Sequence, residues 1–192
     1  METTDKNGVR YFHNGNVVQS VFPAESHFGF SYWSHLIPPF KPREVLILGY
    51  GAGTVGELIR KVWGDTVHIT GVDKHVNPKQ LPFATNGVTV IERDAKDYLA
   101  DTNKEFDFVV VDLFEGAYMS PFVKDPIFVS LLMRVAKKMV AINTFGLDES
   151  TEKIYKQGFS MLKSINVEGR NEIAYFQAID SNNDYSDLNW NK

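Results

Sequence analysis

The sequence predicts an α/β fold in which a mostly parallel sheet is covered by helices on both faces. Apolar strand-like segments alternate with amphipathic helical segments through residues 41–180, an order typical of parallel sheets. The first of these strands, residues 45–48, is apolar throughout, as strands buried on both faces are. The last two, residues 159–167 and 172–179, flank Gly169 without an intervening helix, so we expect an antiparallel hairpin there.

Hydrophobic periodicity places the individual elements. Apolar or alternating runs predict seven strands, at residues 45–48, 67–72, 88–91, 106–111, 139–143, 159–167 and 172–179. Patterns with the helical period predict helices at residues 54–63, 94–99, 121–138 and 149–157. Asp94 is placed to cap the second helix, and Pro121 to occupy the first turn of the third. Pro78 and Pro82 leave little room for a helix within residues 74–87.

Residues 1–40 are expected to form a small N-terminal unit ahead of the sheet domain at 41–180. Residues 1–8 are polar and predict a loose tail. The pair Asn14-Gly15 between two apolar runs predicts a β-hairpin at residues 10–22. The aromatic-rich stretch at residues 25–37 predicts a helical cap that ends at Pro38. The polar residues 181–192 are expected to be disordered.

The composition excludes several classes of protein. Hydrophobic residues make up 43% of the 192 residues and the formal net charge is -4, so we expect a folded domain without a nucleic-acid footprint. No apolar stretch approaches the roughly 20 residues of a membrane span, and the N-terminus lacks the apolar core of a signal peptide. A cytoplasmic protein with no membrane partner is therefore expected. Cysteine is absent and the five histidines lack ligand spacing, so we predict no metal site.

A glycine turn joins the first strand of the domain to its first helix. Gly49, Gly51 and Gly53 follow the apolar run 45–48 directly, and the next strand ends at Asp73. Glycines let a backbone approach a ligand closely, and the free N–H groups at a helix start attract polar groups. A carboxylate at the next strand end can accept hydrogen bonds from two ribose hydroxyls. The stretch therefore predicts a nucleoside-binding βαβ unit rather than a glycine-rich turn without a ligand.

Three aspartates follow neighbouring strands of the predicted sheet. Asp73 and Asp112 stand at strand ends, and Asp94 lies just beyond a third strand. The carboxyl ends of parallel strands meet at one edge of a sheet, where ligands bind in open α/β folds. We therefore expect the three side chains to converge beside the glycine turn. Taken one at a time, Asp94 could act only as a helix cap and Asp112 only as a solvated strand end.

Segments on both sides of the glycine turn resemble spermidine synthases and their shorter relatives. The resemblance covers roughly residues 10–146: YFHNGNVVQSV resembles the family's N-terminal hairpin, VLILGYGAGT its glycine loop, GVD its ribose-binding strand end, ERDAKDYL its adenine-side segment, and FDFVVVDLFEGAYMSPF its catalytic segment. It implies a Rossmann-like class I methyltransferase fold. In that fold a mostly parallel seven-stranded sheet ends in an antiparallel hairpin, and here a small N-terminal β-hairpin precedes it.

The resemblance also implies roles for single residues. The backbone of Gly49, Gly51 and Gly53 would cradle S-adenosylmethionine or decarboxylated S-adenosylmethionine. Asp73 would hold the ribose hydroxyls, and Asp94 with Ala95 would bind the adenine. Asp112 would be the catalytic carboxylate that orients and deprotonates an amine acceptor. The remaining implied substrate residues are Gln19, Tyr32 and Glu115. A small amine-containing acceptor is the expected partner, and homodimers are common in the family.

Two departures keep other functions open. Ala52 stands where the family's glycine loop usually carries an aspartate, and the N-terminal strand domain is shortened. A nucleoside-binding relative without polyamine synthase activity is therefore an alternative. The run Gly51 to Gly56, GAGTVG, followed by Asp73, also fits the dinucleotide pattern. An NAD-binding regulatory domain is the second alternative, and it predicts a parallel sixth strand instead of the antiparallel hairpin.

Overall fold

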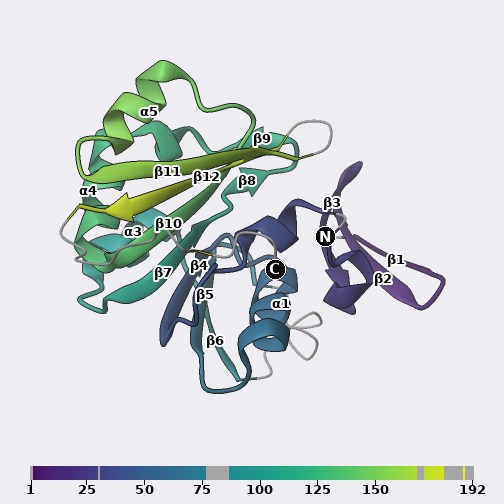
Figure 1. The fold of residues 1–192 in the computed structure, drawn as a ribbon. Helices are drawn as coiled ribbons and strands as arrows, with labels where there is room; N and C mark the ends of the chain where they lie inside the picture. Colours follow the sequence, from purple (N-terminus) through teal and green to yellow (C-terminus); the bar gives the residue numbers. More distant parts are fainter. Residues whose placement is uncertain (1, 30, 77–86, 168–170, 180–187, 189–192) are drawn as a thin grey trace.

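The structure is a computed structural model that describes residues 2–29, 31–76, 87–167, 171–179 and 188. A central sheet of seven strands runs through this described part of the chain (Figure 1). In spatial order the strands are β11 (Phe159–Asn166), β12 (Glu172–Ala178), β10 (Ala136–Thr144), β7 (Phe106–Val111), β4 (Glu44–Leu48), β5 (His68–Asp73) and β6 (Val88–Glu92). The predicted turn at Gly169, most of the predicted helix-free stretch 74–87, and most of the predicted tail 181–192 lie outside the described residues.

The strand directions confirm the predicted sheet. β10, β7, β4, β5 and β6 pair in parallel, and β12 is inserted antiparallel between β10 and β11. From β4 the chain moves outward through β5 to β6, and then returns to β7 on the other side of β4. The strand order thus reverses between β4 and β7. In open α/β sheets that reversal opens a crevice at the carboxyl ends of the strands.

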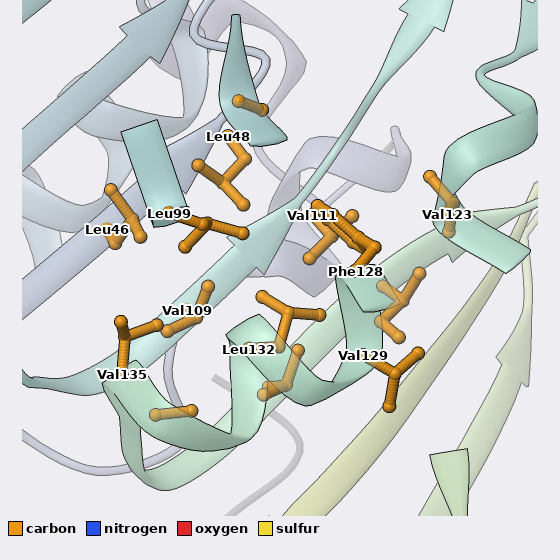
Figure 2. Packing of buried hydrophobic residues seen from close by; sticks show 14 of the residues in the cluster. Leu46, Leu48, Leu99, Val109, Val111, Val123, Phe128, Val129, Leu132 and Val135 are labelled. Carbon is orange, nitrogen blue, oxygen red and sulfur yellow. The ribbon is translucent and has the colours of Figure 1, made fainter. Parts of the chain in front are cut away.

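Alternate side chains of the central strands build a core on each face of the sheet. On β4, Leu46 and Leu48 belong to one cluster, and Val45 and Ile47 to the other. The first cluster, part of which is drawn in Figure 2, includes residues of α3 (Ala95–Asp101), α4 (Pro126–Val135) and α5 (Glu149–Tyr155). The second packs against α1 (Thr54–Trp63) and the N-terminal segment. Both faces are therefore covered, as the apolar strand patterns predict.

The N-terminal unit is a three-stranded antiparallel sheet, so the predicted loose tail is wrong. β1 (Glu2–Lys6) pairs with β2 (Val9–Asn14), which pairs with β3 (Val17–Phe22). Every side chain of β1 is exposed, so the strand carries no apolar pattern that sequence reasoning could detect. Asn7 and Gly8, both with positive φ, make the turn into β2. Two short 3₁₀ helices, η1 (Ala24–His27) and η2 (Tyr32–Leu36), replace the expected helical cap.

Hydrogen bonds fasten the N-terminal unit to the start of α1. The backbone N–H of Val21 donates to Oγ1 of Thr54 at 2.8 Å, and the same hydroxyl donates to the Val21 carbonyl at 3.1 Å. The N–H of Ala24 donates to the Glu57 carboxylate at 3.0 Å. These bonds join β3 and η1 to the first turn of α1. The short N-terminal unit therefore forms part of the site.

The predicted helix at 121–138 is wrong at both ends. Residues Pro121–Lys124 form the 3₁₀ helix η3, and α4 starts only at Pro126, where Asp125 caps it by accepting the N–H of Ile127 at 2.9 Å. A residue before proline avoids the helical region, which explains the break at Asp125. α4 ends at Val135 because the chain enters β10 at once. No helix in the described part of the chain is long and apolar enough to cross a membrane.

Candidate functional site

Two adjoining pockets lie at the carboxyl edge of the sheet. The smaller has a volume of about 60 Å³ and the larger about 230 Å³. Gly49, Asp73 and Phe114 line both of them. Asp94 lines the smaller pocket and Asp112 the larger. The three aspartates expected to converge therefore do meet at one edge of the sheet, arranged along one continuous crevice.

The smaller pocket combines an apolar wall with the start of α3. Oδ1 of Asp94 accepts the N–H of Lys96 at 2.8 Å, so this residue caps α3, as predicted, and also faces the pocket. Ala95 lies beside it at the first position of the helix. The apolar wall is formed by Val72, Leu113 and Phe122. A flat base that offers an amino group would find apolar faces and the carboxylate of Asp94 here.

The glycine loop is held by its own hydrogen bonds. Each backbone N–H from Gly49 to Gly53 donates within the chain, to Val72 O at 2.9 Å, Val72 O at 3.2 Å, Asp73 Oδ2 at 2.8 Å, Ser20 Oγ at 3.0 Å and Tyr50 O at 3.0 Å in that order. Gly53 is the N-cap of α1 with φ of 96° and lines neither pocket. Gly49 and Gly51 do line the larger pocket. Two of the three predicted glycines therefore face the crevice.

Asp73 is oriented by two backbone donors. Its Oδ2 accepts the N–H of Gly51 at 2.8 Å, and its Oδ1 accepts the N–H of His75 at 3.0 Å. The carboxylate lies where the two pockets join. Each carboxylate oxygen has a second lone pair, so both can still accept a hydrogen bond from a ligand hydroxyl. The geometry fits a diol placed between the two pockets.

Asp112 stands at the end of β7 and lines the larger pocket. Its Oδ1 accepts Nδ2 of Asn143 at 2.8 Å, and the Tyr32 hydroxyl also donates to the carboxylate. Burial raises the pKa of Asp112 to about 6; the hydrogen bonds from Asn143 and Tyr32 oppose this, and the negative charge of Asp73 adds to it. A carboxylate with this pKa can exchange a proton near neutral pH.

Tyr32 reaches the larger pocket from η2. Burial, followed by the nearby charge of Asp112, raises the pKa of Tyr32 well above its ordinary value. The phenol therefore stays protonated and remains a hydrogen-bond donor at physiological pH. Gln19 of β3 lines the same pocket. Both residues come from the N-terminal unit, so its attachment to α1 determines where they lie.

Glu115 is separated from the other two predicted substrate residues. It lies on a short hairpin of β8 (Phe114–Glu115) and β9 (Tyr118–Met119). Its side chain lines the smaller pocket, is exposed, and makes an ion pair with Lys74. Gln19 and Tyr32 line the larger pocket instead. An acceptor beside Tyr32 would therefore not reach the face of Glu115 that pairs with Lys74.

The larger pocket is lined by acidic and aromatic side chains. Its described lining residues include Asp73 and Asp112 but no Lys, Arg or His. Phe114 and Phe145 form a ring pair with centroids 4.9 Å apart, and both line the pocket. Carboxylates and aromatic faces attract cations. A neutral or cationic group suits this pocket, whereas an anion would meet like charge.

Sequence reasoning missed several residues of the site. Asn143 had a usable signal, because it is a polar residue at the end of an apolar strand next to Asp112. Ser20 and Asn171 had none, since nothing in their neighbourhood marks them. Phe145 lies just past β10 and gains its role only from the ring of Phe114. Within the described residues, no group of three or more His, Asp or Glu side chains forms a metal cluster.

The comparisons with known proteins bear on the fold. No family model matches the chain, and neither does any curated protein. Among solved structures, 1,6-didemethyltoxoflavin-N1-methyltransferase from Burkholderia thailandensis, with bound S-adenosylhomocysteine, aligns with a TM-score of 0.60 and 13% identity over 94% of this chain and 100% of that one. The N-methyltransferase NodS from Bradyrhizobium japonicum gives 0.59 and 13% over 82% and 97%.

A third solved structure extends the same likeness. Aeropyrum pernix fibrillarin, in complex with S-adenosyl-L-methionine, aligns with a TM-score of 0.57 and 13% identity over 92% of this chain and 98% of that one. Together with the strand order, these likenesses show that the chain has the Rossmann-like fold of class I methyltransferases. At such identities the likeness establishes the fold alone. The narrower resemblance to spermidine synthases stays a prediction.

Proposed function

We propose that this protein is an S-adenosylmethionine-dependent transferase that methylates a small amine. The observation that carries the proposal is Asp112. It is half-buried at the switch point of the sheet, it accepts hydrogen bonds from Asn143 and Tyr32, and it faces a pocket without cationic side chains among its described residues. A carboxylate placed in this way suits the binding and deprotonation of an amine.

The residues of the crevice fit an adenosine. Asp94, Ala95 and the apolar wall of the smaller pocket would receive the adenine. Asp73, whose two oxygens are already aimed by backbone N–H groups, would accept the ribose hydroxyls. Gly49 and Gly51 would leave room for the sulfur end in the larger pocket. Gln19, Tyr32 and Asp112 would surround the acceptor there, with Glu115 outside this group.

The chemistry asked of the chain is small. Bound S-adenosylmethionine would supply a methyl group on a sulfonium, which the acceptor nitrogen attacks as the carbon–sulfur bond breaks. Asp112 would accept a hydrogen bond from the acceptor N–H and take its proton as the new bond forms. Tyr32 and Asn143 would hold the carboxylate while it does so. Phe114 and Phe145 would exclude water from one side of the pocket.

One observation favours decarboxylated S-adenosylmethionine as a second candidate. The N–H groups from Gly49 to Gly53 already donate within the chain, and the described part of the larger pocket has no cationic side chain. The carboxylate of S-adenosylmethionine would therefore meet no positive charge there. Decarboxylated S-adenosylmethionine has no carboxylate and needs no such partner. Against this stands Ala52, which is buried and cannot pair with the cofactor amine. Comparing the dissociation constants of the two forms by calorimetry separates the candidates.

The alternatives make different predictions for ligands. The antiparallel β12 is contrary to the parallel sixth strand that an NAD-binding domain predicts. A relative that binds nucleoside without chemistry would keep the crevice and lack turnover. Thermal shifts with S-adenosylmethionine, S-adenosylhomocysteine, methylthioadenosine and NAD test these ideas, because a ligand of the native state raises its stability. A shift with NAD alone would overturn the proposal. Turnover of an amine panel by wild type, lost in Asp112→Asn, would support it.

A further inference from the structure

Asn143 is a buried amide with both of its ends committed. It lies at the end of β10 with a relative exposure of 1%. Its Nδ2 donates to Oδ1 of Asp112 at 2.8 Å, and its Oδ1 accepts Nδ2 of Asn171 at 2.8 Å. A buried amide is retained at such a cost only when its polar atoms are paired. The pairing here joins three strands of the sheet: β7, β10 and the start of β12.

The polarity of this chain of hydrogen bonds follows from its last member. An ionised carboxylate can only accept, so Asn143 must turn its NH₂ group toward Asp112. Its carbonyl oxygen then faces the opposite way and needs a donor, which Asn171 provides. Asn171 is itself held at the β11–β12 hairpin, where its carbonyl accepts the N–H of Val167 at 2.7 Å. Rotation of the Asn143 amide would therefore break two hydrogen bonds at once.

We propose that Asn143 and Asn171 are positioning residues that keep Asp112 ionised and aimed at the acceptor. Asn143 acts directly on the carboxylate, and Asn171 acts only through Asn143. The inference rests on the proposed transferase function for its catalytic meaning. Its physical content is the charge state and orientation of Asp112, which exists without any substrate.

Other groups around Asp112 also affect its charge, in addition to Asn143 and Asn171. Tyr32 of η2 donates to the same carboxylate, and Asp73 of β5 repels its charge. Lys74, a cationic residue near the crevice, makes an ion pair with Glu115. The hydrogen bonds from Asn143 and Tyr32 therefore lower the pKa of Asp112, whereas burial and the charge of Asp73 raise it. Removing either donor should make protonation of Asp112 easier.

The test is a carboxyl-detected NMR titration of Asp112 in the free protein. In wild type, the Nδ2 protons of Asn143 should titrate with the same midpoint as Asp112. Asn143→Leu should raise the Asp112 midpoint by about one pH unit, the equivalent of one hydrogen bond to a charged group. Asn171→Ala should raise it by about half as much. Asn166→Ala, an exposed amide at the end of β11, is the matched control and should leave the midpoint in place.

The double variant tests the order of action. If Asn171 works through Asn143, adding Asn171→Ala to Asn143→Leu should leave the midpoint of the single Asn143→Leu variant unchanged. An effect of Asn171→Ala that persists in that background overturns the inference, and so does an unmoved midpoint in Asn143→Leu. If Asn143→Leu fails to fold, the wild-type titration decides: an Asn143 amide that does not follow Asp112 overturns the inference.

Turnover separates this inference from the proposed function. With an amine acceptor, the acid limb of kcat should move with the Asp112 midpoint while KM for S-adenosylmethionine stays the same. A shifted NMR midpoint without turnover on any amine would leave the positioning pair standing and reject the transferase. Turnover whose acid limb stays in place in Asn143→Leu would support the transferase and reject the positioning pair.

Discussion

The backbone of Asp112 is in close contact with Gly49. The N–H of Asp112 donates to the carbonyl of Leu48 at 2.8 Å, and a Cβ on Gly49 would overlap the Asp112 carbonyl oxygen. The end of β7 and the start of the glycine loop are thus in contact at the point where the strand order reverses. Asp112 and the glycine loop are therefore positioned by one backbone contact. A side chain at position 49 must separate them.

Gly49→Ala should therefore be strongly destabilising. The residue has φ of 85° and no space for a methyl group, so we expect a loss of more than ~3 kcal/mol in the free energy of unfolding. Gly8→Ala is the matched control, because Gly8 has φ of 78° with nothing within 4 Å of an added Cβ. It should cost only about 1 kcal/mol of left-handed strain. Urea denaturation measures both, and equal losses would refute the contact argument.

Asp112→Asn should stabilise the protein above pH 6. The folded pKa of Asp112, about 6, lies above the ordinary value of 3.8, so the native state binds the proton more tightly than the unfolded chain does. The stability that this proton provides is complete below the unfolded pKa and is lost as pH rises through 6. The neutral amide avoids that loss, which amounts to about 3 kcal/mol at pH 8 and is close to zero near pH 3.5. Denaturation at the two pH values measures it, and Asp97→Asn, at an exposed position, should show no such difference.

The same substitution should abolish methyl transfer while leaving cofactor binding intact. An amide cannot accept the acceptor's proton, so we expect kcat to fall by about 10²–10⁴-fold. The dissociation constant of S-adenosylhomocysteine should change less than about threefold, because Asp94 and Asp73, and not Asp112, would hold the adenine and the ribose. Wild-type kcat should rise with pH through a midpoint near 6. Unaltered turnover in Asp112→Asn would leave the residue a structural one.

Thr54→Val should loosen the N-terminal unit. The Thr54 hydroxyl both accepts from and donates to the backbone of Val21, and valine keeps the shape while leaving two buried polar groups unpaired. We expect a loss of about 1–3 kcal/mol in the free energy of unfolding. Acceptor KM should also rise, since Gln19 and Tyr32 line the pocket from this unit. Thr89→Val, exposed on β6, is the control and should be neutral within about 0.5 kcal/mol.

The sheet and the crevice could be predicted from the sequence because both follow from local patterns. Apolar strands that end at or shortly before an aspartate place Asp73, Asp94 and Asp112 at one edge, and the strand order puts Gly49 among them. The strand β1 was not predictable by pattern, since its side chains are all exposed and only the backbone pairs.

Other features depended on contacts between distant residues. The break before α4 was readable from Asp125-Pro126 but was overridden by the apolar periodicity around it. Asn171 meets Asn143 across the β10–β12 pairing, and no local signal announces such a partner. Glu115 lies apart from Gln19 and Tyr32, because it is on the β8–β9 hairpin and makes an ion pair with Lys74. Contacts between side chains that lie far apart in the chain were thus the main features that the sequence did not predict.

The central claim is that the crevice grips an adenosine through Asp73. Asp73→Ala removes a charged acceptor for two ribose hydroxyls, which should weaken binding by about 30–100-fold. Glu92→Gln is the control, because Glu92 pairs with Asp73 in register on β6 but is exposed and lines neither pocket. It should leave affinity unchanged.

Calorimetric titration of S-adenosylhomocysteine into wild type, Asp73→Ala and Glu92→Gln is the most direct measurement. The account predicts saturable one-to-one binding to wild type and Glu92→Gln, and a large loss in Asp73→Ala. Absence of binding to the folded wild-type protein, or equal affinity in all three, would contradict it.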